Sequence, residues 1–111
     1  MFLKKGFTDP IIFSNYAVIC TQFGQINNAE NIYQKSLELF PNNQAIFAHL
    51  GALLMDIGNL QEAELYIRKA IEIKPNDAKS YLNLALLSKD LYKYKEAEYM
   101  FKKAIEIKSD Y

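Results

Sequence analysis

The sequence has too few cysteines for an internal cross-link and no excess of positive charge that would attract polyanions. It has one cysteine, so no internal disulfide can form and nothing indicates an oxidising compartment. Its 13 basic and 13 acidic residues cancel, and no run of five or more like charges occurs. Nucleic acids and anionic membranes both favour partners with concentrated positive charge. We therefore expect neither a nucleic acid nor a membrane as the partner.

Long apolar runs are also missing. No uninterrupted apolar segment approaches the roughly 18 residues of a membrane span, and the start of the chain lacks the apolar stretch of a secretory signal. A cytoplasmic location is the default expectation. Plentiful lysine, asparagine, isoleucine and tyrosine would suit an AT-rich bacterial genome. With 111 residues, the chain is long enough for one domain.

What the sequence does contain is an internal repeat. The segment from Lys69 to Lys74 recurs unchanged from Lys103 to Lys108, 34 residues later, and Pro41 and Pro75 have the same spacing. This period divides the chain into residues 10–43, 44–77 and 78–111, preceded by residues 1–9. A period of this length is typical of an array of stacked units. The ligand of such an array depends on the side chains that its surface displays.

Each repeat is expected to contain two helices. In the middle repeat, Gly58-Asn59 interrupts the apolar pattern, and Lys74 to Asp77 ends it while offering an N-cap to the next repeat. Two stretches flank the first break, and each has small or apolar residues at the spacing of one helical face: Phe47, Leu50, Gly51 and Leu54, then Leu60, Ala63, Ile67, Ala70 and Ile71. Glu64/Arg68 and Glu98/Lys102 are spaced as i, i+4 ion pairs.

These residues resemble the tetratricopeptide repeat, whose pattern runs aromatic, Leu-Gly, Tyr, Gly, Ala, aromatic, Ala, Pro. The columns are occupied by Phe47, Leu50-Gly51, Leu54, Gly58, Ala63, Ile67, Ala70 and Pro75; by Tyr81, Leu84-Ala85, Ser88, Tyr92, Ala97, Phe101, Ala104 and Ser109; and by Phe13, Tyr16-Ala17, Cys20, Gly24, Ala29, Tyr33, Ser36 and Pro41. The resemblance implies an all-α right-handed superhelix of antiparallel helix pairs, with the first helices lining a concave groove. It also implies a protein–protein interaction scaffold that binds a peptide segment in this groove.

Tyr92 departs from the pattern, because Gly24 and Gly58 stand in the same column of the other repeats. If this turn keeps a left-handed residue, Tyr92 carries about 1 kcal/mol of strain. We then expect Tyr92→Gly to raise the melting temperature. Ser109 replaces the closing proline, as at the end of an array or before a further helix.

The candidate peptide site consists of first-helix residues off the packing stripe: Asn15, Val18, Gln22, His49, Ala52, Met55, Asp56, Lys79, Leu82, Asn83 and Leu86. Asn15, His49 and Asn83 form one column, and the resemblance implies that an asparagine there holds the main chain of an extended peptide. An amide donates and accepts at once, as a peptide backbone requires. The alternative is a set of solvated polar side chains. Lys79 and Asn83 fit a clamp for a C-terminal carboxylate, but Ser14 stands where a further lysine is needed.

No catalytic, metal or cofactor site is expected. His49 is the only histidine, and neither a second histidine nor a thiol lies three or four residues away. Cys20 stands in the packing column of Leu54 and Ser88, which favours a buried, inert thiol. We expect the chain not to be an enzyme.

Both ends of the array leave questions open. Leu3 to Phe7 reads as the last turn of a helix, so residues 1–9 are either the stump of an earlier repeat or a flexible start. At the other end no polar helix covers the last pair, which leaves an apolar edge for self-association: Tyr94, Phe101 and Ile105. Two functions therefore remain beside peptide binding: self-association into a homo-oligomer through this edge, and substrate recruitment within a larger transferase resembling O-linked N-acetylglucosamine transferases.

Overall fold

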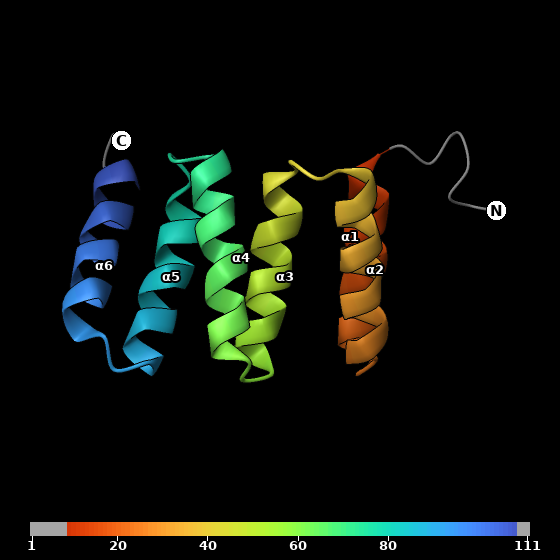
Figure 1. Ribbon diagram of the computed structural model, residues 1–111, viewed down its shortest axis with the longest axis horizontal. Coiled ribbons are helices and arrows are strands. Elements are labelled where there is room, and N and C mark those ends of the chain that lie inside the picture. Colours follow the sequence, from red (N-terminus) through yellow and green to blue (C-terminus); the bar gives the residue numbers. More distant parts are fainter. Residues whose placement is uncertain (1–8, 109–111) are drawn as a thin grey trace.

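The computed structural model describes residues 9–108, and within this range the chain forms helices and no strand. The helices stand side by side as a row of antiparallel pairs, from α1 and α2 at one end to α6 at the other (Figure 1). The predicted all-α repeat solenoid is confirmed. The predictions for Leu3 to Phe7 and for Ser109 fall outside the described residues. The first helix of each pair is α1 (Pro10–Gln22), α3 (Gln44–Asp56) or α5 (Ala78–Asp90), and the second is α2 (Ile26–Leu39), α4 (Leu60–Ile73) or α6 (Tyr94–Lys108).

The helix starts follow from local hydrogen bonds. Asp9 caps α1, because its Oδ1 accepts from the backbone N–H of Ile11 at 3.0 Å, and Pro10 fits the first helical position, where no N–H is needed. Asn43 caps α3 in the same way, accepting from the N–H of Ile46 at 3.1 Å. These bonds satisfy donors that the helix itself leaves unpaired.

The turns between paired helices share one left-handed residue. Gly24 has φ 77° and Gly58 has φ 84°, and Tyr92 adopts φ 64° in the third repeat. The predicted left-handed turn at Tyr92 is therefore confirmed. Tyr92 is 78% exposed, and its ring meets the ring of Tyr94 edge-on, with centroids 6.2 Å apart. Tyr92 thus adopts a conformation that its Cβ disfavours.

The core is continuous along the row of helices. Within each pair the two helices pack closely, and α2 packs on α3 as α4 packs on α5. Leu50, Leu54 and Ile67 are fully buried, and the thiol of Cys20 is buried as expected. Gly51 allows α3 to approach α4, because a Cβ at this position would lie 2.6 Å from Cγ1 of Ile67.

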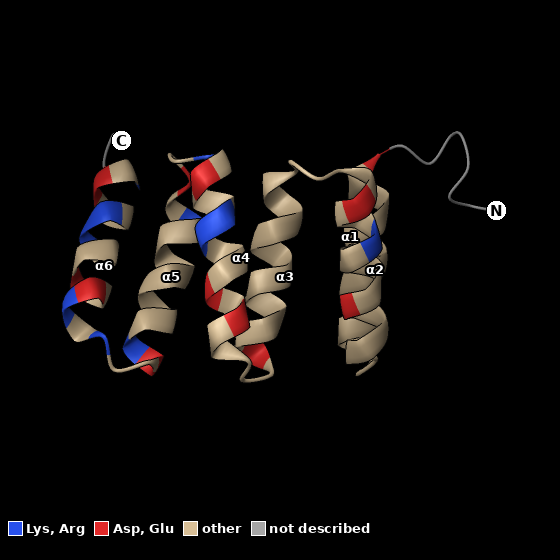
Figure 2. Cartoon of the chain, viewed as in Figure 1, with Lys and Arg blue, Asp and Glu red and all other residues tan. Residues whose placement is uncertain are grey.

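Charged side chains lie mainly on the second helices. Figure 2 shows them along α2, α4 and α6, whereas α3 and α5 carry charge only near their ends and α1 carries none. Both expected i, i+4 pairs form, with Arg68 to Glu64 at 2.9 Å and Lys102 to Glu98 at 3.7 Å. Arg68 also donates to Glu96 of α6. This hydrogen bond is the main reason why the pKa of Glu96 lies below its usual value.

Candidate functional site

A pocket of about 170 Å³ lies between the neighbouring first helices α3 and α5. We call it the α3–α5 pocket. It is flanked by residues on successive turns of α3, which share one helical face, and by residues from the start of α5. The lining residues are Gln44, Ala45, Ala48, His49, Ala52, Asp77, Lys79 and Asn83.

One end of the α3–α5 pocket is fixed by a small hydrogen-bond network. The Gln44 side chain donates from Nε2 to Oδ2 of Asp77 at 2.6 Å and to Oγ of Ser80 at 3.2 Å. Ser80 Oγ in turn donates to the same Asp77 oxygen at 2.8 Å. Asp77 stands at the N-cap position of α5 but makes no side-chain cap hydrogen bond. Its carboxylate instead ties the starts of α3 and α5 together.

His49 packs against the neighbouring helix α2. Its ring stacks on the buried ring of Tyr33 from α2, with centroids 6.2 Å apart and planes 19° from parallel. Burial, and secondly the positive charge of Lys79, lower the pKa of His49 below 6.5. This shift favours the neutral imidazole, in which one ring nitrogen donates a hydrogen bond and the other accepts one.

The structure brings together some of the proposed groove residues and separates others. His49, Ala52, Lys79 and Asn83 line the α3–α5 pocket. The others are distributed differently: Asn15, Val18 and Gln22 are exposed on α1, Asp56 is exposed at the end of α3, Met55 packs against the core, Leu86 is partly buried, and Leu82 lines a second cavity. The column of Asn15, His49 and Asn83 thus contributes two of its members to one pocket.

Sequence reasoning missed Gln44, Ala45 and Asp77 as pocket residues. Gln44 and Asp77 lie at helix starts, where capping is the ordinary interpretation of a polar side chain. Their positions near the beginnings of two first helices, which pack side by side, were the available signal.

The second cavity lies at the end of the row of helices, between α5 and α6. It is mainly apolar, has a volume of about 510 Å³, and is lined by Ala78, Lys79, Leu82, Ala104, Ile105 and Lys108. Of the proposed edge residues, Tyr94 and Ile105 are 61% and 67% exposed, and Phe101 is partly buried. We refer to the surface around this cavity as the α5–α6 face.

Residues 9–108 contain no group of three or more His, Cys, Asp or Glu side chains placed to hold a metal ion. Among these residues, no helix is long and apolar enough to cross a membrane. The lining of the α3–α5 pocket combines hydrogen-bonding side chains with apolar alanines.

Comparisons with known proteins agree with the repeat pattern. The family model of the cilia and flagella-associated protein 70 middle TPR-like domain matches residues 8–110. No curated protein matches the chain. The resemblance to tetratricopeptide repeats is therefore confirmed on the family level, and the described helices fit three such repeats.

Solved structures share the fold. The Arabidopsis OM64 TPR domain superposes with a TM-score of 0.84 at 24% identity, covering 92% of this chain and 84% of that one. The first TPR of Spaghetti (RPAP3), bound to the HSP90 peptide SRMEEVD, gives 0.85 at 16% identity, with 92% and 81% covered. MamA gives 0.84 at 22% identity, and this chain spans 58% of its length while 90% of this chain is covered.

Proposed function

The chain belongs to the family of the cilia and flagella-associated protein 70 middle TPR-like domain, and from this premise we propose that it is a protein-interaction scaffold that binds an extended peptide segment along its first helices. The observation that carries the proposal is the α3–α5 pocket, where His49, Lys79 and Asn83 converge. A similar fold, that of the first TPR of Spaghetti, was solved with a bound peptide.

The pocket chemistry suits a peptide main chain. The Asn83 amide and the His49 imidazole in its neutral form can each donate and accept, and a backbone presents one donor and one acceptor for each residue. Stacking on Tyr33 fixes the His49 ring, so that less side-chain entropy is lost on binding. Side chains that hydrogen-bond in this way recognise the peptide backbone whatever the peptide's side chains are.

The pocket size and its surroundings indicate which side chains fit. A cavity of about 150 Å³ admits a group as large as benzene, so the α3–α5 pocket has room for one side chain of moderate size. Ala48 and Ala52 are apolar residues of its lining. Val18 and Leu82 expose apolar surface on the neighbouring first helices. We therefore expect an extended peptide with apolar side chains between its main-chain contacts.

Selection from a random peptide library tests the proposal. The wild-type chain and the double variant His49→Ala/Asn83→Ala are panned in parallel, after circular dichroism has shown equal helicity. Loss of two hydrogen bonds at about 0.5–1.5 kcal/mol each should weaken a selected peptide roughly 5- to 150-fold. Asn31→Ala, at an exposed position of α2 away from the pocket, is the matched control and should bind like the wild type.

Asn15 provides a graded comparison. Because Asn15 shares the column of His49 and Asn83 but does not line the pocket, Asn15→Ala should weaken binding less than either pocket variant does. Peptides enriched equally by the wild type and the double variant would contradict a site in the α3–α5 pocket. No enrichment by the wild type would contradict autonomous peptide binding altogether.

A further inference from the structure

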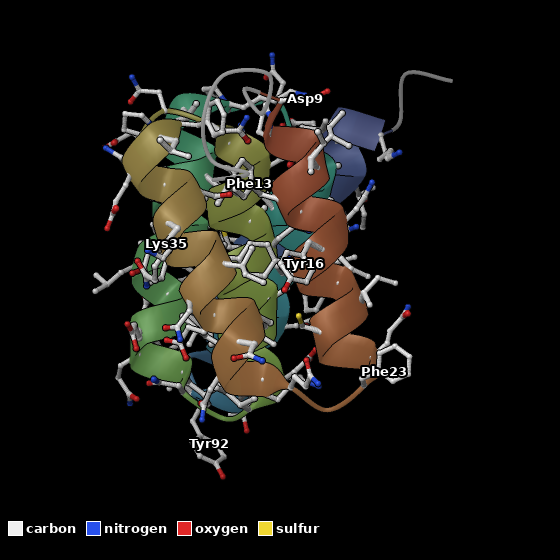
Figure 3. All side chains as sticks on the ribbon, turned by 90° about the vertical axis from the view of Figure 1, so that its right-hand side faces the viewer. Asp9, Phe13, Tyr16, Phe23, Lys35 and Tyr92 are labelled. Atoms are coloured by element: carbon white, nitrogen blue, oxygen red, sulfur yellow. The ribbon has the colours of Figure 1, made fainter. Side chains whose placement is uncertain are left out.

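The outer side of α1 carries an exposed apolar stripe. Ile12, Tyr16, Ile19 and Phe23 follow one another at the spacing of one helical face, and they are 42%, 50%, 49% and 76% exposed. Figure 3 looks onto this end of the molecule, with Tyr16 midway along α1 and Phe23 projecting from its end. We call these residues the α1 stripe. No charged side chain occurs on α1 to interrupt it.

Three of the four stripe positions are buried in the other two repeats, whereas the counterparts of Phe23, Ile57 and Leu91, are 45% exposed and partly buried. The residues that lie 34 positions after Ile12, Tyr16 and Ile19 are 0%, 0% and 5% exposed, and those a further 34 positions on are 1%, 1% and 0% exposed. They are, in order, Ile46, Leu50 and Leu53 of α3, and Ser80, Leu84 and Leu87 of α5.

The first helices differ in their described neighbours. Like α3, α1 packs against the second helix of its own pair and against the next first helix. What α1 lacks, among the described residues, is a preceding pair, whereas α3 packs on α2 and α5 packs on α4. The α1 stripe therefore has the composition of a junction between repeats and the exposure of a surface.

The other half of such a junction is exposed at the opposite end. The α5–α6 face has the mainly apolar cavity of about 510 Å³, bordered by Ala104 and the 67% exposed Ile105. The corresponding residues 34 positions earlier, Ala70 and Ile71, are fully and partly buried where α5 packs on α4. Within residues 9–108, both halves of an interface that the chain forms internally are thus exposed.

We propose that the α1 stripe of one copy packs onto the α5–α6 face of a second copy, head to tail, so that the junction between α4 and α5 is repeated between molecules. The α1 stripe carries no charged side chain, and the cavity is mainly apolar, with Lys79 and Lys108 as the charged residues of its lining. The α5–α6 face shares Lys79 with the lining of the α3–α5 pocket, but the inference does not depend on peptide binding.

Polar residues around the contact are compatible with this arrangement. Inside the chain, Arg68 pairs with Glu96 and Glu64 pairs with Lys93 across the junction. Between copies, the repeat spacing places Lys102 opposite Asn28 of the second copy, and Glu98 opposite its Gln25. No like charges oppose each other at these positions. A head-to-tail contact is heterologous, so that an open array of any length keeps one free stripe and one free face.

Sedimentation velocity over a wide range of concentrations tests the proposal. The average molar mass of the wild type should rise with concentration beyond that of a dimer. Tyr16→Glu blocks the α1 stripe and Ile105→Glu blocks the α5–α6 face, so that each variant alone should sediment as a monomer. Both side chains are at least half exposed, and circular dichroism should show unchanged helicity.

A mixture of the two variants is the decisive sample. Tyr16→Glu retains its α5–α6 face and Ile105→Glu retains its α1 stripe, so that an equimolar mixture should form a one-to-one dimer and nothing larger. Leu65→Glu, at a 70% exposed apolar residue of α4, is the matched control and should assemble like the wild type. A wild type that stays monomeric, a single variant that still dimerises, or a mixture that does not recombine would each overturn the proposal.

Discussion

The left-handed backbone of Tyr92 leads to a specific prediction about the stability of the chain. With φ 64°, it adopts the left-handed conformation that glycine occupies in the other two turns. Such a conformation costs a residue with a Cβ about 1–2 kcal/mol. Tyr92→Gly removes this cost, but glycine is more flexible in the unfolded chain, which subtracts about 0.4–1 kcal/mol.

The ring of Tyr92 contributes little against this gain. It is 78% exposed, and its edge-on contact with Tyr94 is solvated, so that its loss costs a few tenths of a kcal/mol. We expect a net stabilisation of about 0.5 kcal/mol, which corresponds to roughly 2–4 °C in the melting temperature. Thermal unfolding followed by circular dichroism, with urea unfolding in parallel, measures it.

Two matched variants separate the backbone from the ring. Tyr92→Ala removes the ring but keeps a Cβ, so it should not raise the melting temperature. Gly58→Ala adds a Cβ at φ 84° with no atom within 4 Å, so it should lower the melting temperature through backbone strain alone. An unchanged or lower melting temperature for Tyr92→Gly would refute the reasoning, because the ring would then stabilise the turn more than its strain destabilises it.

Three further predictions concern packing and titration. Gly51→Ala should destabilise the chain by about 1 kcal/mol although alanine has the better helix propensity, because the new Cβ collides with Ile67. Urea unfolding measures the loss of stability, and an equal loss in an Ile67→Ala background would contradict the collision as its cause. The pKa of Glu96 is lowered mainly by its hydrogen bond from Arg68. The contribution of Glu96 to folding stability is therefore present above the ordinary glutamate pKa and is lost as the pH falls through the lowered value. Arg68→Met should lower the free energy of unfolding by about 0.2–1 kcal/mol near pH 7 and by less in acid or at high salt, and an equal loss in acid and near pH 7 would exclude this ion pair as the cause. Burial, and then the lysine of the α3–α5 pocket, lower the pKa of His49, so an NMR titration should find it below 6.5, with stability falling as the pH drops below that value; a pKa at or above 6.5 would mean that the ring is solvated.

Much of the fold was predictable because helix periodicity and turn chemistry are local. The start of α4 follows from the Gly58-Asn59 break before it and from the apolar spacing that begins at Leu60. The left-handed turn at Tyr92 was predictable from register alone, since two glycines occupy its column. The repeat pattern also predicted how the helix pairs stack, because such units bury their apolar faces against their neighbours.

The candidate site was less accessible to sequence reasoning, because it depends on contacts between repeats. The stacking of His49 on Tyr33 joins different helix pairs, and the Asp77 carboxylate bonds to Gln44 rather than capping its own helix. The exposure of Tyr16 was also not predicted. Its apolar spacing is the same whether or not a preceding pair covers it, so periodicity alone could not distinguish a core position from a surface one.

The most direct test of peptide binding in the α3–α5 pocket is a residue-resolved map of the bound state. A peptide selected by the wild-type chain is titrated into ¹⁵N-labelled protein, and amide chemical shifts are followed. We expect the largest changes at residues 44–52 and 77–83, which contain the pocket lining, with small changes along α2 and α4. Changes centred on α1 or on the α5–α6 face, with His49 and Asn83 unaffected, would contradict the pocket as the binding site.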